Sequence, residues 1–120
     1  MRHSTGNRTK AEQARFDKMK EMGICMACYQ DGVKGRQYIE INHALSGNRR
    51  IGHMATYSLC LWHHQSEPMD GMTKNEMFQE HGPSLKYPGS KPFRARYGSD
   101  AELIAMQNEI LGEMNGASVY

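Results

Sequence analysis

Two stretches of the chain repeat hydrophobic residues at helical spacing, one near each end. In the first, residues 10–22 are good helix formers with three apolar side chains on one face, and a glycine follows them. In the second, apolar residues recur from 101 to 111 behind the capping pair Ser99-Asp100. The pattern therefore predicts a helix over residues 10–22 and a C-terminal helix that ends near Gly112 or Gly116.

Between these helices the pattern changes to short runs that favour β-structure. Residues 36–42 contain three strand-favouring side chains and predict a strand with His43 at its end. Residues 44–55 are basic and broken by glycine, which is typical of a loop. Residues 56–66 predict a strand or turn that leads into a short helix.

The remaining segments are marked by turn residues. Cys25 and Cys28 flank a tight knuckle, and Asp31-Gly32 is a hairpin-type turn that leads into the predicted strand. Residues 74–81 predict a further short helix, whereas the prolines and glycines of residues 81–93 predict an extended loop.

The size and composition of the chain favour one small core that needs reinforcement. Its 120 residues fall in the range of a single domain, and 38% hydrophobic with 8% aromatic residues is lean for a self-sufficient core. A metal cross-link is physically useful in such a chain. We expect residues 1–10 to form a basic flexible arm and residues 11–120 to form a single zinc-containing domain.

The distribution of charge along the chain is more informative about nucleic-acid binding than the net charge of +2. Residues 1–20 contain six Lys or Arg against two Asp or Glu, a local excess of +4 that suits contact with phosphate. Two further arginines lie in the central loop, where the alternative is simple solvation. The residues predicted to contact nucleic acid are Arg2, Arg8, Lys10, Arg49 and Arg50. A second basic cluster in the late loop consists of Lys86, Lys91, Arg94 and Arg96.

Cysteine usage indicates the compartment. Three cysteines cannot all pair as intramolecular disulfides, and no apolar stretch approaches the length of a signal sequence or a membrane span. We therefore expect a reducing cytoplasm and no membrane partner. In that setting the same cysteine spacing favours metal binding over disulfide formation.

Four residues have the spacing of a structural zinc site. Cys25-x-x-Cys28 and Cys60-x-x-His63 are two ligand pairs with the same internal spacing, although His64 is an alternative fourth ligand. The segment between the pairs is long, so we expect the strands that carry His43 to be inserted there. The alternative is that the cysteines are simply small buried residues.

Adjacent histidines cannot easily bind the same ion, so one of them is left for another task. With His63 in the zinc site, His64 points elsewhere on the same short helix and His43 is the natural residue for it to meet. Two histidines facing each other across a divalent ion suit metal-assisted hydrolysis of a phosphodiester. The alternative is that both are surface or satisfied core histidines.

Several segments together resemble a known family. EINHAL and GHMATYSLCLWHHQ, downstream of a C-x-x-C pair, resemble the HNH (His-Me finger) nuclease motif. With GPSL, GSKPF and RYGSDAELI, the order of segments resembles the phage recombination-enhancement family of RecA-dependent nucleases over roughly residues 23–111.

The resemblance implies a small α+β protein with a zinc-stapled ββα-metal core between an N-terminal and a C-terminal helix. It implies that His43 is the general base and His64 binds the catalytic ion, magnesium or manganese, while the four residues above hold structural zinc. It further implies a metal-dependent DNA endonuclease that acts on DNA bound by host RecA, in the cytoplasm of a phage-infected bacterium.

Two positions depart from the family pattern. Asn42 precedes the general base where His or Asp is common, and its neutral amide is a poorer ligand for a hard cation. The central Asn of the motif is also missing, so His53 is a candidate to bind metal, contact phosphate or cap the loop. Asp100 and His81 are weaker candidates, since each has a competing role at a helix end.

Two other functions remain open at this level. Because Asn42 is a poor ligand for a catalytic ion, it favours the alternative that the protein is a noncatalytic zinc-bound module that binds DNA or RecA. A zinc-knuckle adaptor for protein partners alone would show no salt-dependent affinity for DNA, and the basic N-terminal residues argue against it.

Overall fold

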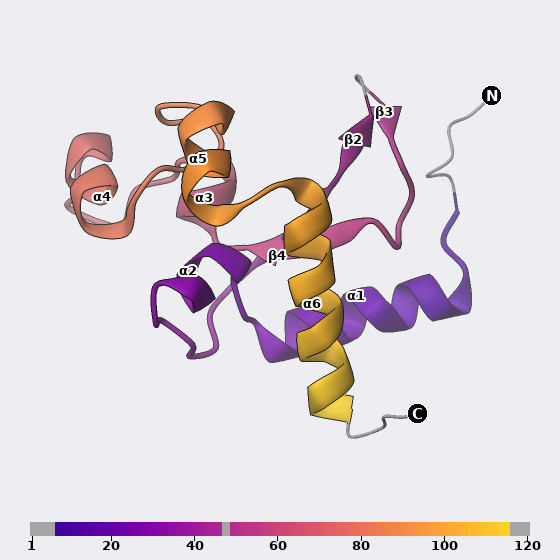
Figure 1. Cartoon of the computed structure of the whole chain (residues 1–120). Helices are drawn as coiled ribbons and strands as arrows, with labels where there is room; N and C mark the ends of the chain where they lie inside the picture. The colour runs from indigo at the N-terminus through magenta and orange to yellow at the C-terminus, as the bar shows by residue number, and fades with distance from the viewer. Residues whose placement is uncertain (1–6, 47–48, 116–120) are drawn as a thin grey trace.

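The computed structural model describes residues 7–46 and 49–115 of the chain, which form a small α+β protein (Figure 1). Arg2, one of the predicted nucleic-acid contacts, lies outside the described residues. In chain order the elements are α1 (Lys10–Met22), α2 (Met26–Gln30), β1 (Glu40–His43), β2 (Leu45–Ser46), β3 (Arg49–Arg50), β4 (Thr56–Leu59), α3 (Leu61–Gln65), α4 (Lys74–His81), α5 (Ser90–Tyr97) and α6 (Asp100–Asn115).

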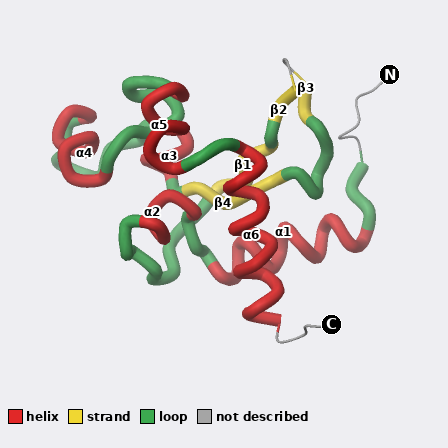
Figure 2. The backbone as a smooth tube through the Cα atoms, viewed as in Figure 1, coloured by secondary structure: helices red, strands yellow, loops and turns green. Residues whose placement is uncertain are grey.

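The antiparallel pair β1–β4 lies at the centre of the described structure (Figure 2). Its register runs from Glu40 opposite Leu59 to His43 opposite Thr56. All four positions of β4 are buried, whereas β1 is half-buried. Helices α1 and α3 contact both strands and α6 contacts β4, so helices from both ends of the chain hold this sheet.

Local signals account for α1, and the predicted helix over residues 10–22 is confirmed. Thr9 and Glu12 form a capping box, in which each side chain accepts a hydrogen bond from the backbone N–H of the other residue. At the other end Gly23 adopts a left-handed conformation with φ 59°. A Cβ at Gly23 would lie 2.5 Å from the carbonyl oxygen of Gln37, so glycine is required there.

The predictions for residues 25–42 were partly wrong. The knuckle between the cysteines is the short helix α2, and Asp31-Gly32 ends that helix through hydrogen bonds back to it rather than closing a hairpin. The strand begins at Glu40, because the backbone N–H of Gln37 is already bonded to the carbonyl of Gly23. Only four residues of β4 are available to pair with it.

The basic segment predicted as a loop contains a small hairpin. β2 and β3 pair with Leu45 opposite Arg50, and the hairpin projects away from the central sheet (Figure 1). The predicted strand and helix over residues 56–66 are confirmed as β4 and α3, and the helix predicted over residues 74–81 is confirmed as α4.

The late segment needed two corrections. The predicted extended loop over residues 81–93 gives way to α5 at Ser90, because Pro92 falls in the first helical turn, where a missing N–H costs nothing. The cap of α6 is Ser99, which forms a capping box with Glu102, and not Asp100. The C-terminal helix itself is confirmed and extends to Asn115.

One hydrophobic cluster joins these elements. It takes side chains from all six helices, from β4 and from Ile39 just before β1, with Tyr57, Phe16 and Phe93 among its largest fully buried members. None of the helices formed by residues 7–46 and 49–115 is long and apolar enough to cross a membrane.

Candidate functional site

The four residues predicted to bind zinc converge on one point. Their ligand atoms all lie within 4.8 Å of one another, and all four side chains are buried. The Nδ1 atom of His63 is 3.6, 3.5 and 3.3 Å from the sulfurs of Cys25, Cys28 and Cys60, and the sulfurs of Cys28 and Cys60 are 3.8 Å apart. A tetrahedral zinc ion places two sulfurs about 3.8 Å apart, and a sulfur and a nitrogen about 3.5 Å apart. The donor set therefore fits a structural metal such as zinc.

Both ligand pairs are built in the same way, by the first turn of a short helix. Cys25 caps α2 and Cys60 caps α3, and each sulfur accepts the backbone N–H three residues later, from Cys28 and His63 respectively. An N-cap residue and the third residue of its helix lie on the same side of the turn. The x-x spacing thus brings both members of each pair to the ion.

A second layer fixes the orientation of His63. Its Nε2–H donates to the carbonyl oxygen of His81 at 2.9 Å, which leaves Nδ1 as the metal-binding nitrogen. The hydroxyl of Tyr97 donates to the same carbonyl, and its ring packs edge-on against the imidazole. His81 therefore serves the centre through its backbone, while its side chain lies beside Glu80.

The protonation of the thiols also suits a metal. Hydrogen bonds from the thiols of Cys25 and Cys28 lower the pKa of Cys60 to about 3, whereas burial raises the pKa of Cys25. One thiolate is thus stabilised before binding. The positive charge of a bound ion would offset the cost of burying the thiolates that form when the remaining thiols lose their protons.

His43 and His53 meet at the end of β1. The Nε2 atom of His43 lies 3.1 Å from Nδ1 of His53, and both rings pack edge-on against Phe16 of α1. Burial, together with the positive charges of Arg50 and Arg8, lowers the pKa of His43 to about 4, so its imidazole is neutral at pH 7. Within the described residues no hydrogen bond engages Nδ1 of His43.

The loop that carries His53 is held in place by α1. The carbonyl of His53 accepts a hydrogen bond from the hydroxyl of Thr56, and that hydroxyl accepts one from Arg15. Arg15 also donates to Asn108 of α6. The backbone at His53 is therefore linked through Thr56 and Arg15 to elements from both ends of the chain, and its side chain is buried.

On α3, His64 contacts a residue that sequence reasoning missed. Its Nδ1 lies 2.8 Å from a carboxylate oxygen of Glu40, the first residue of β1. Burial opposes ionisation of this carboxyl, but hydrogen bonds from His64 and Gln65 outweigh it and lower the pKa of Glu40. Glu40 and His64 are far apart in the sequence, so only its position three residues before His43 could have drawn attention to Glu40.

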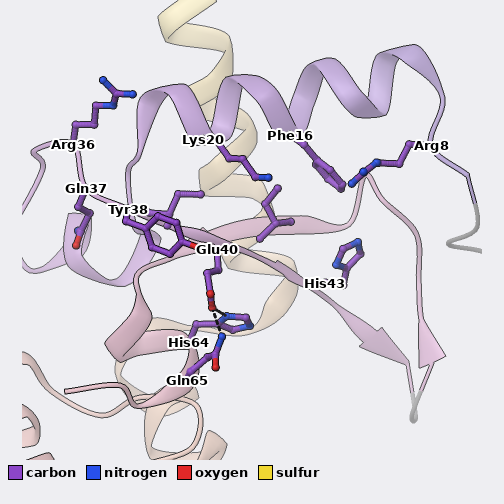
Figure 3. Close-up of a pocket in the computed structure, with 12 residues that line it drawn as sticks. Arg8, Phe16, Lys20, Arg36, Gln37, Tyr38, Glu40, His43, His64 and Gln65 are labelled. Atoms are coloured by element: carbon purple, nitrogen blue, oxygen red, sulfur yellow. Dashed lines mark hydrogen bonds and ion pairs between the residues drawn. The ribbon is translucent and has the colours of Figure 1, made fainter. Parts of the chain in front are cut away.

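His43 and His64 line the same groove, and in Figure 3 Glu40 reaches His64 while His43 lies apart from this pair, further along the groove. The groove has a volume of about 810 Å³ and runs along β1 beside α1. Asn42 is half-buried on β1 opposite Tyr57 and is not among the residues that line the groove. Its role stays a prediction.

The predicted nucleic-acid contacts lie in three places. Arg49 and Arg50 are exposed on β3, Lys10 is exposed at the start of α1, and Arg8 lines the groove with its guanidinium 5.0 Å from the ring centre of Phe16. The late basic cluster is weakened as a DNA-binding surface by internal ion pairs. Arg94 pairs with Asp100 at 2.8 Å and Arg96 pairs with Asp31 at 2.9 Å.

The fold and site thus define a small α+β protein with a buried Cys₃His cluster that could hold a metal ion and a histidine-lined groove beside its central strands. The family model described as recombination enhancement, RecA-dependent nuclease matches residues 8–112, nearly the whole described chain. The protein belongs to that family, whose name implies a nuclease that works with RecA on DNA. A search of curated proteins found no match.

Proposed function

We propose that this protein is a metal-dependent DNA endonuclease of the HNH type that cuts DNA held in a RecA filament during phage recombination, in the host cytoplasm. The observation that carries the proposal is the neutral imidazole of His43, braced by His53 on the same groove as the Glu40–His64 pair. The order β1, β4 and α3, with the metal centre at the start of α3, supports assignment to the ββα-metal core.

In this proposal His43 takes the proton from the attacking water. In the tautomer that this role requires, the Nε2–H of His43 donates to Nδ1 of His53, 3.1 Å away, and Nδ1 of His43 carries the lone pair that accepts the proton. The imidazolium that forms keeps its hydrogen bond to His53, as the base in a catalytic triad keeps its orienting partner. His53 thus supplies the orientation expected of the missing central Asn.

His64 would hold the catalytic ion, and Glu40 would orient His64. Because Nδ1 of His64 donates to Glu40, its Nε2 lone pair is left to bind a divalent cation, as in carboxylate–histidine–metal arrangements. Magnesium or manganese bound there would stabilise charge on the leaving oxygen. The partner carboxylate stays ionised, since its hydrogen bonds lower the pKa of Glu40.

The test is cleavage of single-stranded, duplex and RecA-coated DNA with magnesium or manganese, on protein shown to contain zinc. Cleavage that requires the divalent ion and is strongest on RecA-coated DNA supports the proposal. Retained DNA binding without cleavage of any substrate would instead favour a noncatalytic zinc-bound module.

The Glu40→Ala variant is expected to need about 10-fold to 100-fold more magnesium for half-maximal cleavage, the usual effect of losing an outer-shell partner of a metal-binding histidine. The magnesium requirement of Glu40→Gln should lie between those of the wild-type protein and Glu40→Ala, because its amide oxygen can still accept a hydrogen bond from His64. Magnesium titrations of cleavage measure the shift, with Glu109→Ala on the exposed surface of α6 as the control. An unchanged magnesium requirement in Glu40→Ala would refute the orienting role.

The His53→Ala variant is expected to cleave about 10-fold to 100-fold more slowly, part of the factor that a positioned base supplies. Cleavage by the wild-type protein should fall only as pH drops towards 4, where His43 becomes protonated. Removing His53 admits water and raises the pKa of His43, so the loss should move to higher pH. His53→Asn offers an amide oxygen that can still accept from Nε2 of His43, so it should restore the rate. A slower variant with an unshifted pH profile would indicate a purely structural role.

A further inference from the structure

The groove beside β1 is lined by cations that have no acidic partner in the described structure. Arg8, Lys20 and Arg36 are all exposed and all line it, and none takes part in an ion pair with another described residue. The single acidic residue among the lining residues is Glu40, whose carboxylate is occupied by His64 and Gln65. The groove is therefore positively charged along a wall that leads to the candidate active site.

An exposed aromatic ring lies in the same groove. Tyr38 is 68% exposed and is the one aromatic residue among the exposed large hydrophobic residues of the described chain. In Figure 3 its ring lies on the β1 side near Glu40, while Lys20 and Arg8 come from the α1 side. A largely exposed tyrosine ring next to cations that form no ion pair with a described residue is the combination with which proteins bind the bases and phosphates of a single strand.

We propose that this groove binds one unpaired DNA strand, with a base stacked on Tyr38 and phosphates contacted by Arg8, Lys20 and Arg36. The inference rests on the proposed function, because the bound strand is the one presented to His43 and His64 on the same groove. In a duplex each base face is covered by its neighbours, so only an unpaired base offers a face to the tyrosine. The site therefore selects DNA whose bases are unstacked, as opposed to a regular duplex.

The experiment measures binding to a fluorescently labelled single strand and to its blunt duplex, without divalent ions and without RecA. Fluorescence anisotropy should show that Tyr38→Ala weakens single-strand binding by about 5-fold to 150-fold, the range of base–aromatic stacking. Binding to the duplex should change little. Tyr38→Phe is the matched control, because it keeps the ring but removes the hydroxyl that helps lower the pKa of Glu40.

A second pair of variants tests the cations. Lys20→Gln combined with Arg36→Gln should reduce the salt dependence of single-strand binding, with the slope of log K against log salt falling by about 1.4 for two lost phosphate contacts. The control combines Lys34→Gln with Lys74→Gln, two exposed lysines outside the groove. Their loss should leave the slope nearly unchanged.

A strand that contains 2-aminopurine reports stacking directly. Its fluorescence should be quenched by the wild-type protein and by Tyr38→Phe but much less by Tyr38→Ala. The proposal fails if Tyr38→Ala binds the single strand normally, if both DNA forms lose affinity equally, or if only binding to the RecA protein changes. Because no cleavage is measured, groove-dependent strand binding by a protein that never cuts DNA would uphold this inference while the proposed nuclease function fails.

Discussion

The His43→Ala variant is expected to cleave DNA about 100-fold to 10,000-fold more slowly than the wild-type protein, the contribution of a positioned general base. The side chain lies at the end of β1, contacts His53 and the edge of Phe16, and takes no part in the Cys₃His centre. Zinc content, thermal stability and DNA affinity should therefore be retained. Cleavage rates under single-turnover conditions measure the loss.

Two comparisons separate chemistry from structure in this variant. Because His43 lines an open groove, added imidazole should enter the vacated space and partly restore cleavage by His43→Ala. His81→Ala is the matched control, since its backbone carbonyl, not its side chain, contacts the metal centre. If His43→Ala cleaved DNA at the wild-type rate, His43 could not be the general base. The same conclusion would follow if His81→Ala lost as much cleavage rate as His43→Ala.

The second large effect concerns the neighbouring histidines of α3. His63→Ala removes one of four buried ligands and is expected to abolish zinc binding and folding together. Structural zinc supplies about 10–16 kcal/mol in small zinc-binding peptides. The whole stability of a domain is about 5–15 kcal/mol. His64→Ala, one residue further on, should keep both zinc and the thermal transition, because His64 faces the groove.

Zinc analysis and circular dichroism of the purified variants decide this prediction. The wild-type protein treated with a strong chelator should resemble His63→Ala. If His64→Ala lost the metal while His63→Ala kept it, the ligand assignment would be reversed. If both variants kept zinc and stability, the Cys₃His centre would not be what stabilises the fold.

The parts of the fold that local chemistry determines could be predicted from the sequence. The helix predicted over residues 10–22 is confirmed at both ends, and the structure shows that a capping box and a left-handed glycine fix those ends within one turn. The metal ligands were predicted because the spacing of each pair is itself one turn of a helix. Where a single turn decides the geometry, the sequence carries the information.

Interactions between distant residues could not be read in this way. The late start of β1 depends on a hydrogen bond from Gln37 to Gly23. Helix α5 lies where prolines and glycines predict a loop, because a proline is equally compatible with a loop and with the first turn of a helix. Glu40 was overlooked because its partner His64 lies on a different element. His53 was left with several possible roles because its contact with His43 depends on the path of the loop between them.

Because His63 and His64 are adjacent on α3, the direction of one side chain constrains the direction of the other. Successive side chains on a helix are rotated by about 100°, so a ligand that points inward fixes the direction of the next side chain outward. An ion bound to His63 would therefore fix the rotation of α3 about its axis, and with it the direction of His64 toward the groove. A single residue inserted between the two histidines would leave the Cys60-x-x-His63 pair intact but rotate the imidazole of His64 by about 100°, to another side of the helix.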